Sequence, residues 1–542
     1  MSRNFFGGLD RFASKMSSSA SSRGQQEQIA VASHSDAFTS RYFAIRVVDA
    51  STGRGVPLVF LRTTYKAIYM TDSAGYVAFF EPGLMTGEPL WVTVSSYGFE
   101  SPTGFLHCEG TAINPVSGGS VEIRLKRTQI AERLYRMTGY GIYRDSLLLG
   151  KPVPIEKPVL NAQVAGSDTI QCAAFQGKLL WLWQDTDRMS FPLGNFSMTG
   201  ATTELPAHLD PESGLNFKYY TVDDQPNQFT RPMVQIQLKK NGTYPVWVDG
   251  LTVVPDQTGK ERLVARYYAA DHDMSCIEEG LVLWNDTAQI FERLETFQRA
   301  DSLAPGGHAI YAYDNGTRYV YYGKNVRVKA DFSSVVDPSQ YEAFTCLSPD
   351  GKKSKRKMTG SLVWGWVKGG KPVHFDNADS LIRAGILRPE ESPYRLVDVD
   401  TQQRVVAAQV GIAWNPYLGL WVNIIQQKMG DTTAGEIFYA TASSPEGPWQ
   451  HCRKVATHHM SRDSYKCNHN DLYNPVQHYE LMREGGRIVY FSGTLVNTFS
   501  GNQWWTPLYN YNNIMYRLDL KDPRLQLPRP PPGLWPTKPE AV

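Results

Sequence analysis

The sequence predicts an all-β chain in which a small antiparallel β-sandwich precedes a five-bladed β-propeller. Three observations support this prediction. A hairpin of short apolar and aromatic strands recurs along the chain. Its copies are separated by roughly 50 to 95 residues, as in a repeat architecture with insertions. Aromatic residues make up 12% of the 542 residues. Tyr and Trp suit the pleated surfaces of sheets, and they also suit surfaces that bind carbohydrate.

Five copies of the hairpin carry the propeller prediction. Each has a short apolar strand, a turn with Gly, Asp or Asn, and a second strand rich in aromatic residues. The copies occupy residues 170–183, 246–270, 308–323, 406–427 and 474–494. Units of this kind bury only part of their faces when isolated, and they bury the rest by packing side by side in a ring.

The remaining segments give the expected domain order. Residues 1–38 are rich in Ser, Gln and Ala, and we expect a disordered tail. Residues 39–128 contain alternating strands and tight turns, which predict the sandwich. Residues 129–525 are assigned to the propeller, with an insertion at about 352–397, and residues 526–542 form a Pro-rich tail.

Three local predictions concern the joints of the propeller. Residues 129–137 are interpreted as a short helical linker. Residues 140–149 are interpreted as the strand that closes the last blade, because ring closure removes exposed strand edges. Residues 376–387 within the insertion have a helical pattern, with Asp376 as a possible N-cap.

Composition excludes several classes of protein. The formal net charge is +2, so there is no general argument for nucleic-acid binding, and the basic run at 352–357 is expected to be a solvated loop. The chain has no run of 18 apolar residues, which predicts no membrane insertion. The first residues lack the apolar core of a usual signal peptide, so the compartment stays open. The 6 Cys residues show no metal-binding CxxC spacing.

The first hairpin carries an unusual group of acids. Asp168 stands at the entry of its first strand, and Asp185 and Asp187 stand at the exit of its second strand. A hairpin returns the chain to its starting point, so all three are expected at one edge of the sheet. Crowded carboxylates repel one another and destabilise the fold, so their presence at one edge indicates a functional site. The alternative is that they are solvated residues at strand ends.

In a propeller the first strand of each blade lines the central axis, so the entry ends of these strands open onto one face. The side chains expected there are Asp168, Asp249, His308 and Asn474. We predict in particular that Asp168, Asp185 and Asp249 converge on one pocket, and that crowding raises the pKa of at least one of them.

Two stretches resemble the five-bladed propeller glycosidases of the arabinanase and fructan-hydrolase type. Residues 168–186 have the order Asp, apolar strand, Gly-Lys, aromatic strand, Asp-Thr. Residues 438–449, FYATASSPEGPW, are similar to a turn between the outer strands of those blades. Residues 183–203 also resemble an uncharacterised-domain branch of these propellers. The resemblance covers about residues 139–525.

The N-terminal module resembles transthyretin-like and carboxypeptidase-regulatory β-sandwiches. The residues that carry this resemblance are VVDASTG at 47–53 and TDSAGY at 71–76. The resemblance implies a structural or binding module attached to an enzyme.

The propeller resemblance implies a carbohydrate substrate and cleavage of glycosidic bonds, possibly furanosidic ones, by paired carboxylates. Asp185 or Asp168 would be the base or nucleophile, Asp249 its partner, and Glu279 the general acid. The residues expected to bind substrate are Asp187, His272, His308, Asn474 and Trp183. The chain departs from the family pattern where the third and fourth blades would supply acids, because His308 and the acid-free residues 405–414 stand there.

His469 and Asp471 fall near the place where related propellers hold an axial ion, so the resemblance implies a structural or axial Ca²⁺ there. A hydrogen-bonded loop is the alternative interpretation of these two residues. Two other functions also stay open. One is a non-catalytic propeller that binds glycans or serves as a scaffold, and the other is a polysaccharide lyase that uses His and Tyr.

Overall fold

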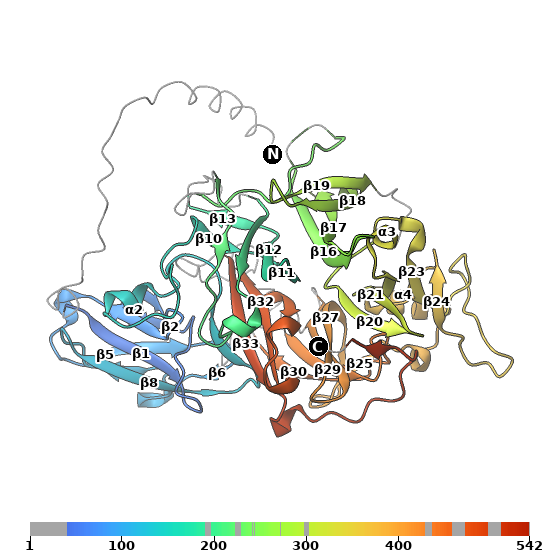
Figure 1. The fold of residues 1–542 in the computed structure, drawn as a ribbon. Helices are drawn as coiled ribbons and strands as arrows, with labels where there is room; N and C mark the ends of the chain where they lie inside the picture. Colours follow the sequence, from blue (N-terminus) through green and yellow to red (C-terminus); the bar gives the residue numbers. More distant parts are fainter. Residues whose placement is uncertain are drawn as a thin grey trace, which may run out of the picture.

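The computed structural model describes residues 41–189, 197–222, 229–240, 242, 244–271, 273–296, 303–428, 436–457, 472–496 and 511–540. The predicted fold class is confirmed: the chain is all-β, and a sandwich precedes five sheets that follow one another around a common centre (Figure 1). In the described part of the chain, no helix has the length and apolar character needed to span a membrane.

The sandwich consists of two four-stranded sheets in the orders β4-β1-β8-β6 and β3-β2-β5-β7. The strands are β1 (Phe43–Asp49), β2 (Phe60–Thr63), β3 (Ile68–Met70), β4 (Tyr76–Phe79), β5 (Leu90–Ser95), β6 (Phe99–Glu100), β7 (Thr111–Ile113) and β8 (Ser120–Arg127). The expectation of a purely antiparallel sandwich needs one correction, because β1 and β8 pair in parallel. Two strands so far apart in sequence are joined by a long connection, which permits parallel pairing.

Blades I and II follow the sandwich. Blade I has the order β11-β12-β14-β15, and blade II has the order β16-β17-β18-β19. The bounds in blade I are β11 (Ile170–Phe175), β12 (Lys178–Trp183), β14 (Thr199–Thr203) and β15 (Lys218–Tyr219), with the separate pair β10 (Val164–Ser167) and β13 (Thr186–Arg188) beside it. Those in blade II are β16 (Val246–Pro255), β17 (Glu261–Ala270), β18 (Cys276–Asn285) and β19 (Ile290–Thr296).

Blades III to V complete the ring, in the orders β24-β23-β22-β21-β20-β34, β26-β25-β30-β29-β28-β27 and β31-β32-β33-β9. Blade III contains β20 (Ile310–Asp314), β21 (Thr317–Tyr322), β22 (Val326–Lys329), β23 (Glu342–Thr345), β24 (Gly365–Lys368) and β34 (Lys538–Pro539). Blade IV contains β25 (Leu396–Asp398), β26 (Arg404–Val405), β27 (Ala407–Asn415), β28 (Leu420–Gln427), β29 (Ile437–Ala442) and β30 (His451–Ala456). Blade V contains β31 (Leu472–Gln477), β32 (Ile488–Val496), β33 (Tyr511–Asp519) and β9 (Glu132–Arg136).

The strand that closes the ring is β9, which pairs antiparallel with β33. The prediction that residues 140–149 close the last blade is therefore wrong, and so is the helical linker at 129–137. All five side chains of β9 are buried. A strand covered on both faces loses the alternating pattern by which strands are recognised. Residues 140–149 instead contain a turn and the short helix α2 (Arg144–Leu148).

Two further helices lie in the insertions of blade III, α3 (Phe332–Val335) and α4 (Phe375–Arg383). The helix expected at 376–387 is thus present, but its N-cap is His374 rather than Asp376. The imidazole Nδ1 of His374 accepts a hydrogen bond from the backbone N–H of Asp376 at 3.2 Å. The side chain of Asn377 reaches back to the backbone N–H of His374 at 3.0 Å, which completes a capping box.

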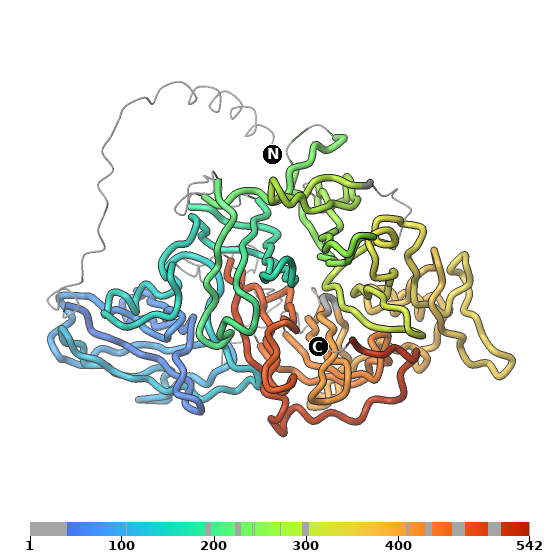
Figure 2. Tube along the Cα trace, viewed as in Figure 1, coloured from blue at the N-terminus to red at the C-terminus, as the bar shows by residue number. Residues whose placement is uncertain are grey.

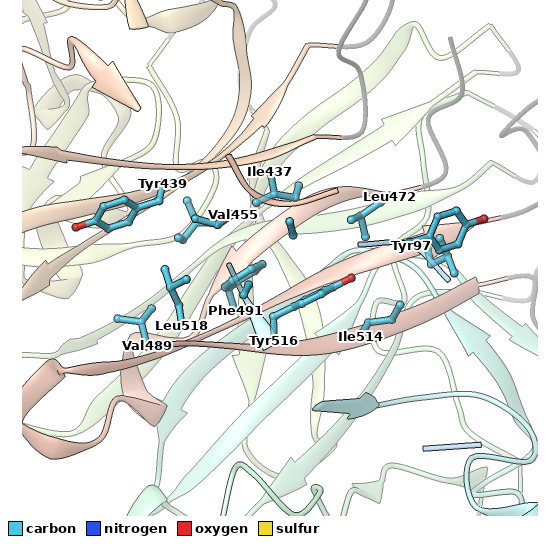
Figure 3. Close-up of a cluster of buried hydrophobic side chains, with 14 of the residues drawn as sticks. Tyr97, Ile437, Tyr439, Val455, Leu472, Val489, Phe491, Ile514, Tyr516 and Leu518 are labelled. Atoms are coloured by element: carbon cyan, nitrogen blue, oxygen red, sulfur yellow. The ribbon is translucent and has the colours of Figure 1, made fainter. Parts of the chain in front are cut away.

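The sandwich and the propeller share one hydrophobic core. Leu58, Phe60, Met70 and Tyr97 of the sandwich belong to the same buried cluster as residues of blades IV and V, and Figure 3 draws Tyr97 together with Leu472 of blade V. The buried guanidinium of Arg133 on β9 crosses this joint and donates to the carbonyl oxygens of Pro57, at 2.9 Å, and Tyr97. The sandwich is therefore packed directly against the propeller.

The C-terminal segment continues from blade V across the molecule to blade III, where β34 pairs with β20 (Figure 2). Along this path the indole N–H of Trp535 donates to Asp314 at 2.9 Å, and the hydroxyl of Thr537 donates to the buried Glu446 at 2.8 Å. Arg318 binds both carboxylate oxygens of Glu540, at 3.0 and 3.1 Å. The Pro-rich tail is thus docked against the blades over its described length.

Candidate active site

The first hairpin brings its acids together as its sequence indicates. Its turn is Gln176-Gly177, and both residues have positive φ, +48° and +73°, as a two-residue hairpin turn requires. The register then places Ile170 opposite Trp183. Just beyond this pair, the backbone N–H of Asp168 donates to the carbonyl oxygen of Asp185 at 2.7 Å.

Asp187 lies two residues further along, in β13. It stands opposite Gly166 of β10, so the two chains of the hairpin stay paired beyond the blade. Its side chain is buried. Asp168, Asp185 and Asp187, which we call the aspartate cluster, therefore share one edge of blade I.

Asp168 is buried and is held by hydrogen bonds from two neighbouring residues. Its Oδ1 accepts hydrogen bonds from the hydroxyl of Tyr473 at 2.6 Å and from the backbone N–H and hydroxyl of Thr169 at 2.6 and 3.1 Å. The pKa of Asp168 is raised to about 7, mainly by burial and also by the charge of Asp185, while the hydrogen bonds from Tyr473 and Thr169 act in the opposite direction. A substantial fraction of this carboxyl group is thus protonated at neutral pH.

Asp185 lies in a different environment. It is only partly buried, and its Oδ1 accepts a hydrogen bond from the indole N–H of Trp247 at 2.8 Å. The Trp247 ring is itself stacked on Tyr268, with ring centroids 6.1 Å apart. Blade II thereby fixes the orientation of a carboxylate that belongs to blade I.

Two tyrosines of blade V complete the surroundings of the aspartate cluster. Burial raises the pKa of Tyr511, and the charges of Asp168, Asp185 and Asp187 raise it further. Burial also raises the pKa of Tyr473, again assisted by the charge of Asp168. Both phenols therefore keep their protons at neutral pH and can act as hydrogen-bond donors beside the acids.

A pocket of about 280 Å³ opens next to the aspartate cluster at the entry ends of the inner strands. We call it the axial pocket. Residues of four blades and of the α4 segment line it: Thr169, Gln171, Gln184, Asp249, Gly306, Gly307, His308, Gly323, Lys324, His374, Phe375, Asp376, Asn474, Pro475 and Val476.

Asp249 lines the axial pocket from blade II, and its carboxylate accepts three hydrogen bonds. Its carboxylate accepts from the Gln171 side chain at 3.1 Å and from the backbone N–H groups of Gly250 and Gly307, each at 2.9 Å. Its neighbour His308 comes from blade III. Burial lowers the pKa of His308, and the charge of Asp249 acts in the opposite direction, so the imidazole is neutral at neutral pH.

The aspartate cluster and the axial pocket are joined by short links. The side-chain amide of Asn474 donates to the hydroxyl of Thr169, the residue that follows Asp168. Trp247, which binds Asp185, lies two residues from Asp249 on β16, and residues two apart on a strand point to the same face. The structure thus places Asp168, Asp185, Asp249, His308 and Asn474 around one end of the propeller axis.

Glu279 is not part of this arrangement. It lies on β18, the third strand from the axis, opposite Tyr268 of β17. Its carboxylate is ion-paired with the guanidinium of Arg266. The hypothesis that Glu279 is the general acid does not fit this position, because strand β17 separates it from the inner strand β16 that carries Asp249.

Trp183 cannot bind a substrate. Its side chain is 0% exposed and packs in the core of blade I against Phe217 and Tyr219, at ring-centroid distances of 5.1 and 5.3 Å. The sequence placed an aromatic residue next to the acids, but a strand buried on both faces turns this residue away from solvent.

Three predicted residues, His272, His469 and Asp471, lie outside the described residues. The calcium site that the last two were expected to form therefore stays a prediction. Elsewhere, the described ranges contain no group of three His, Cys, Asp or Glu side chains able to hold a metal ion.

Sequence reasoning missed the partners that other blades supply. Trp247, Tyr473 and Tyr511 contact or surround the aspartate cluster, and Lys324 and His374 line the axial pocket. Tyr473 directly precedes Asn474, which was predicted, so it could have been found by extending the entry end of that strand by one residue. The other residues could be found only once the arrangement of the blades around the axis was known.

No family model and no curated protein matches the chain. Its similarity to solved structures is low. An exo-β-1,3-galactanase from Phanerochaete chrysosporium with β-1,3-galactotriose is 11% identical, over 73% of this chain and 67% of the other, with a TM-score of 0.36. The GH43_1 enzyme from Xanthomonas citri complexed with xylotriose is 11% identical, over 72% and 90% of the two chains, with a TM-score of 0.30. TM-scores below 0.5 do not establish a shared activity.

Proposed function

We propose that this protein is a carbohydrate-active enzyme that hydrolyses glycosidic bonds at the axial end of its propeller. The observation that carries the proposal is the pair formed by Asp168 and Asp185. The two carboxyl groups are close enough for the charge of one to raise the pKa of the other, yet one is enclosed and the other is partly open. Glycoside cleavage needs one carboxyl group that holds a proton and one that is ionised.

The contacts support a different role for each carboxyl group. The hydroxyl of Tyr473 and the N–H and hydroxyl of Thr169 all donate to Oδ1 of Asp168, so the proton of its neutral form would be carried by Oδ2. Asp168 would hand this proton to the leaving oxygen. Asp185, oriented by Trp247, would serve as the base or nucleophile. Asp249 would orient the sugar ring or tune the pair from blade II, because its hydrogen bonds already fix its carboxylate.

A second candidate is a propeller that binds a glycan without cleaving it. The position of Glu279 favours this candidate, since the residue expected to be the general acid is ion-paired with Arg266. The lyase alternative has less support. The hydroxyl of Tyr473, the tyrosine in contact with Asp168, donates a hydrogen bond to that carboxyl group, and burial raises the pKa of this tyrosine. A lyase would need a tyrosine or histidine that readily accepts a proton.

The experiment is a product-detected screen over arabinans, fructans, galactans and uronans, performed with the wild type and with Asp185→Asn. We expect wild-type activity on one of these polymers and a loss of at least about a hundredfold in the variant, because a base or nucleophile contributes two or more decades. Asp256→Asn, in an exposed turn of blade II, is the matched control and should keep full activity. Binding without cleavage by the wild type would favour the second candidate.

A further inference from the structure

The wall of the axial pocket that belongs to blade III differs from the rest of its lining. Blades I, II and V contribute Thr169, Gln171, Gln184, Asp249 and Asn474, which are neutral or acidic. The blade III side contributes Lys324 and His374, with Asp376 beside them. These two basic side chains take no part in the chemistry proposed above, so their presence in the pocket needs another explanation.

Lys324 lies in the turn between β21 and β22. Within the described part of the chain, its ammonium group has no ion-pair partner, and the side chain is exposed. The turn is held against the segment that precedes α4, because the side-chain amide of the buried Asn325 donates to the carbonyl oxygen of Val373 at 2.8 Å. The charge of Lys324 is close enough to His374 to help lower the pKa of that imidazole, after the larger effect of burial.

The tautomer of His374 follows from its role as the N-cap of α4. Its Nδ1 accepts the backbone N–H of Asp376, so Nδ1 carries no hydrogen and the proton of the neutral ring is on Nε2. Within the described part of the chain, Nε2–H of His374 donates to no other residue, so it is free to bind a ligand. The first turn of α4, with its partial positive charge, borders the same side of the pocket.

We propose that this wall binds the anionic substituent, a carboxylate or a sulfate, of an acidic sugar residue. The ammonium of Lys324 and Nε2–H of His374 would donate to its oxygen atoms. The inference rests on the proposed function in taking the ligand to be a sugar, and it adds the chemical class of that sugar. Asp249 lies on blade II and would repel an anion, which directs the acidic group toward blade III and the neutral hydroxyls toward Asp249.

Asp376 is the one charged group of this wall that opposes the proposal. Its carboxylate lies 3.7 Å from Nδ1 of His374, and its side chain is 47% exposed. It therefore weakens anion binding without blocking it, since exposed charges are screened by water and salt. Removing the charge of Asp376 should therefore raise the affinity for the anion.

The experiment measures binding by ligand-observed NMR to the full-length Asp185→Asn protein, so that no turnover interferes. The probes are methyl glucuronide, glucose 6-sulfate and the neutral methyl glucoside. We expect the glucuronide, the sulfate or both to bind at least about tenfold more tightly than the glucoside, since charge-assisted hydrogen bonds are about twice as strong as neutral ones. If only the glucuronide binds, the ligand is a uronic acid. If both anions bind equally well, the pocket recognises the negative charge and does not distinguish a carboxylate from a sulfate.

Four variants in the same background assign the effect. Lys324→Met should remove the preference for the anion and leave binding of the glucoside unchanged, whereas Lys324→Arg should keep the preference. Asp376→Asn should raise the affinity for the anion a few-fold. Lys329→Met, on β22 of the same blade and outside the pocket lining, is the matched control and should behave as its parent.

The proposal is overturned if the neutral sugar binds as tightly as both anions, or if Lys324→Met keeps the preference. Its failure is distinguishable from failure of the proposed function. Cleavage of neutral glycans that depends on Asp185, without any preference for anions, refutes the acidic sugar and leaves the hydrolase in place. A preference for anions together with an Asp185→Asn protein as active as the wild type refutes the assigned chemistry instead.

Discussion

Asp168→Asn should change how the stability of the protein depends on pH. In the unfolded chain this carboxyl group has a pKa of 3.8, and in the folded protein burial and Asp185 raise it to about 7. Below pH 4 both states are protonated. As the pH rises from 4 to 7 the unfolded chain loses its proton first, so the folded state is progressively destabilised and the loss is complete above pH 7. At 1.36 kcal/mol per pKa unit, the difference between 3.8 and about 7 corresponds to about 4 kcal/mol.

The assay is urea unfolding, followed by tryptophan fluorescence, of the wild type and the variant at several pH values. Between pH 5 and 8 the free energy of unfolding of the wild type should fall relative to Asp168→Asn by about 2 to 3 kcal/mol. Glu446 and Glu480, whose pKa values are raised to about 7 by burial, titrate in both proteins and cancel in the comparison.

The control is Asp256→Asn, which removes a partly exposed carboxylate. Hydrogen bonds from the side chain and backbone of Thr258 lower the pKa of Asp256. It should not reproduce the effect. If the wild type and Asp168→Asn keep the same difference in stability from pH 5 to 8, Asp168 is not a carboxyl group of raised pKa, and the assignment of acid and base given above is wrong.

Two further predictions concern residues outside the chemistry. Trp183→Ala should lower the free energy of unfolding by about 3 to 5 kcal/mol, as expected for a fully buried aromatic side chain. The fraction that folds should keep its affinity for glycans. Weaker glycan binding at unchanged stability would show that Trp183 belongs to the site. Arg133→Met should cost about 3 kcal/mol, because the carbonyl groups of Pro57 and Tyr97 lose a charged donor at the joint between sandwich and propeller. The same urea titration measures this loss, and a variant as stable as the wild type would show that the sandwich does not depend on that contact.

What the sequence revealed correctly is local. The turn at Gln176-Gly177 fixes the register of the first hairpin, and this register alone places Asp168 and Asp185 at one edge. The repeat of the hairpin then predicts the blades, because each unit needs neighbours to cover its faces. Both arguments use residues that are close together along the chain.

What the sequence concealed depends on contacts between distant segments. Tyr473 reaches Asp168 across 305 positions of sequence, and Trp247 reaches Asp185 across 62. The closing strand β9 is buried on both faces, so it lacks the alternation that marks a strand. Glu279 was expected to be the general acid, and only the pairing of β17 with β18 shows that it lies on the third strand of blade II, ion-paired with Arg266.

The pH dependence of kcat/KM on the polymer found in the screen tests the central claim, that Asp168 holds the proton and Asp185 is ionised. If Asp168 is the general acid, burial keeps it protonated up to a pKa of about 7, and kcat/KM should fall tenfold per pH unit above that value. A rate that rises through pH 7, or one that does not change between pH 6 and 8, would contradict this assignment and remove Asp168 from the role of acid.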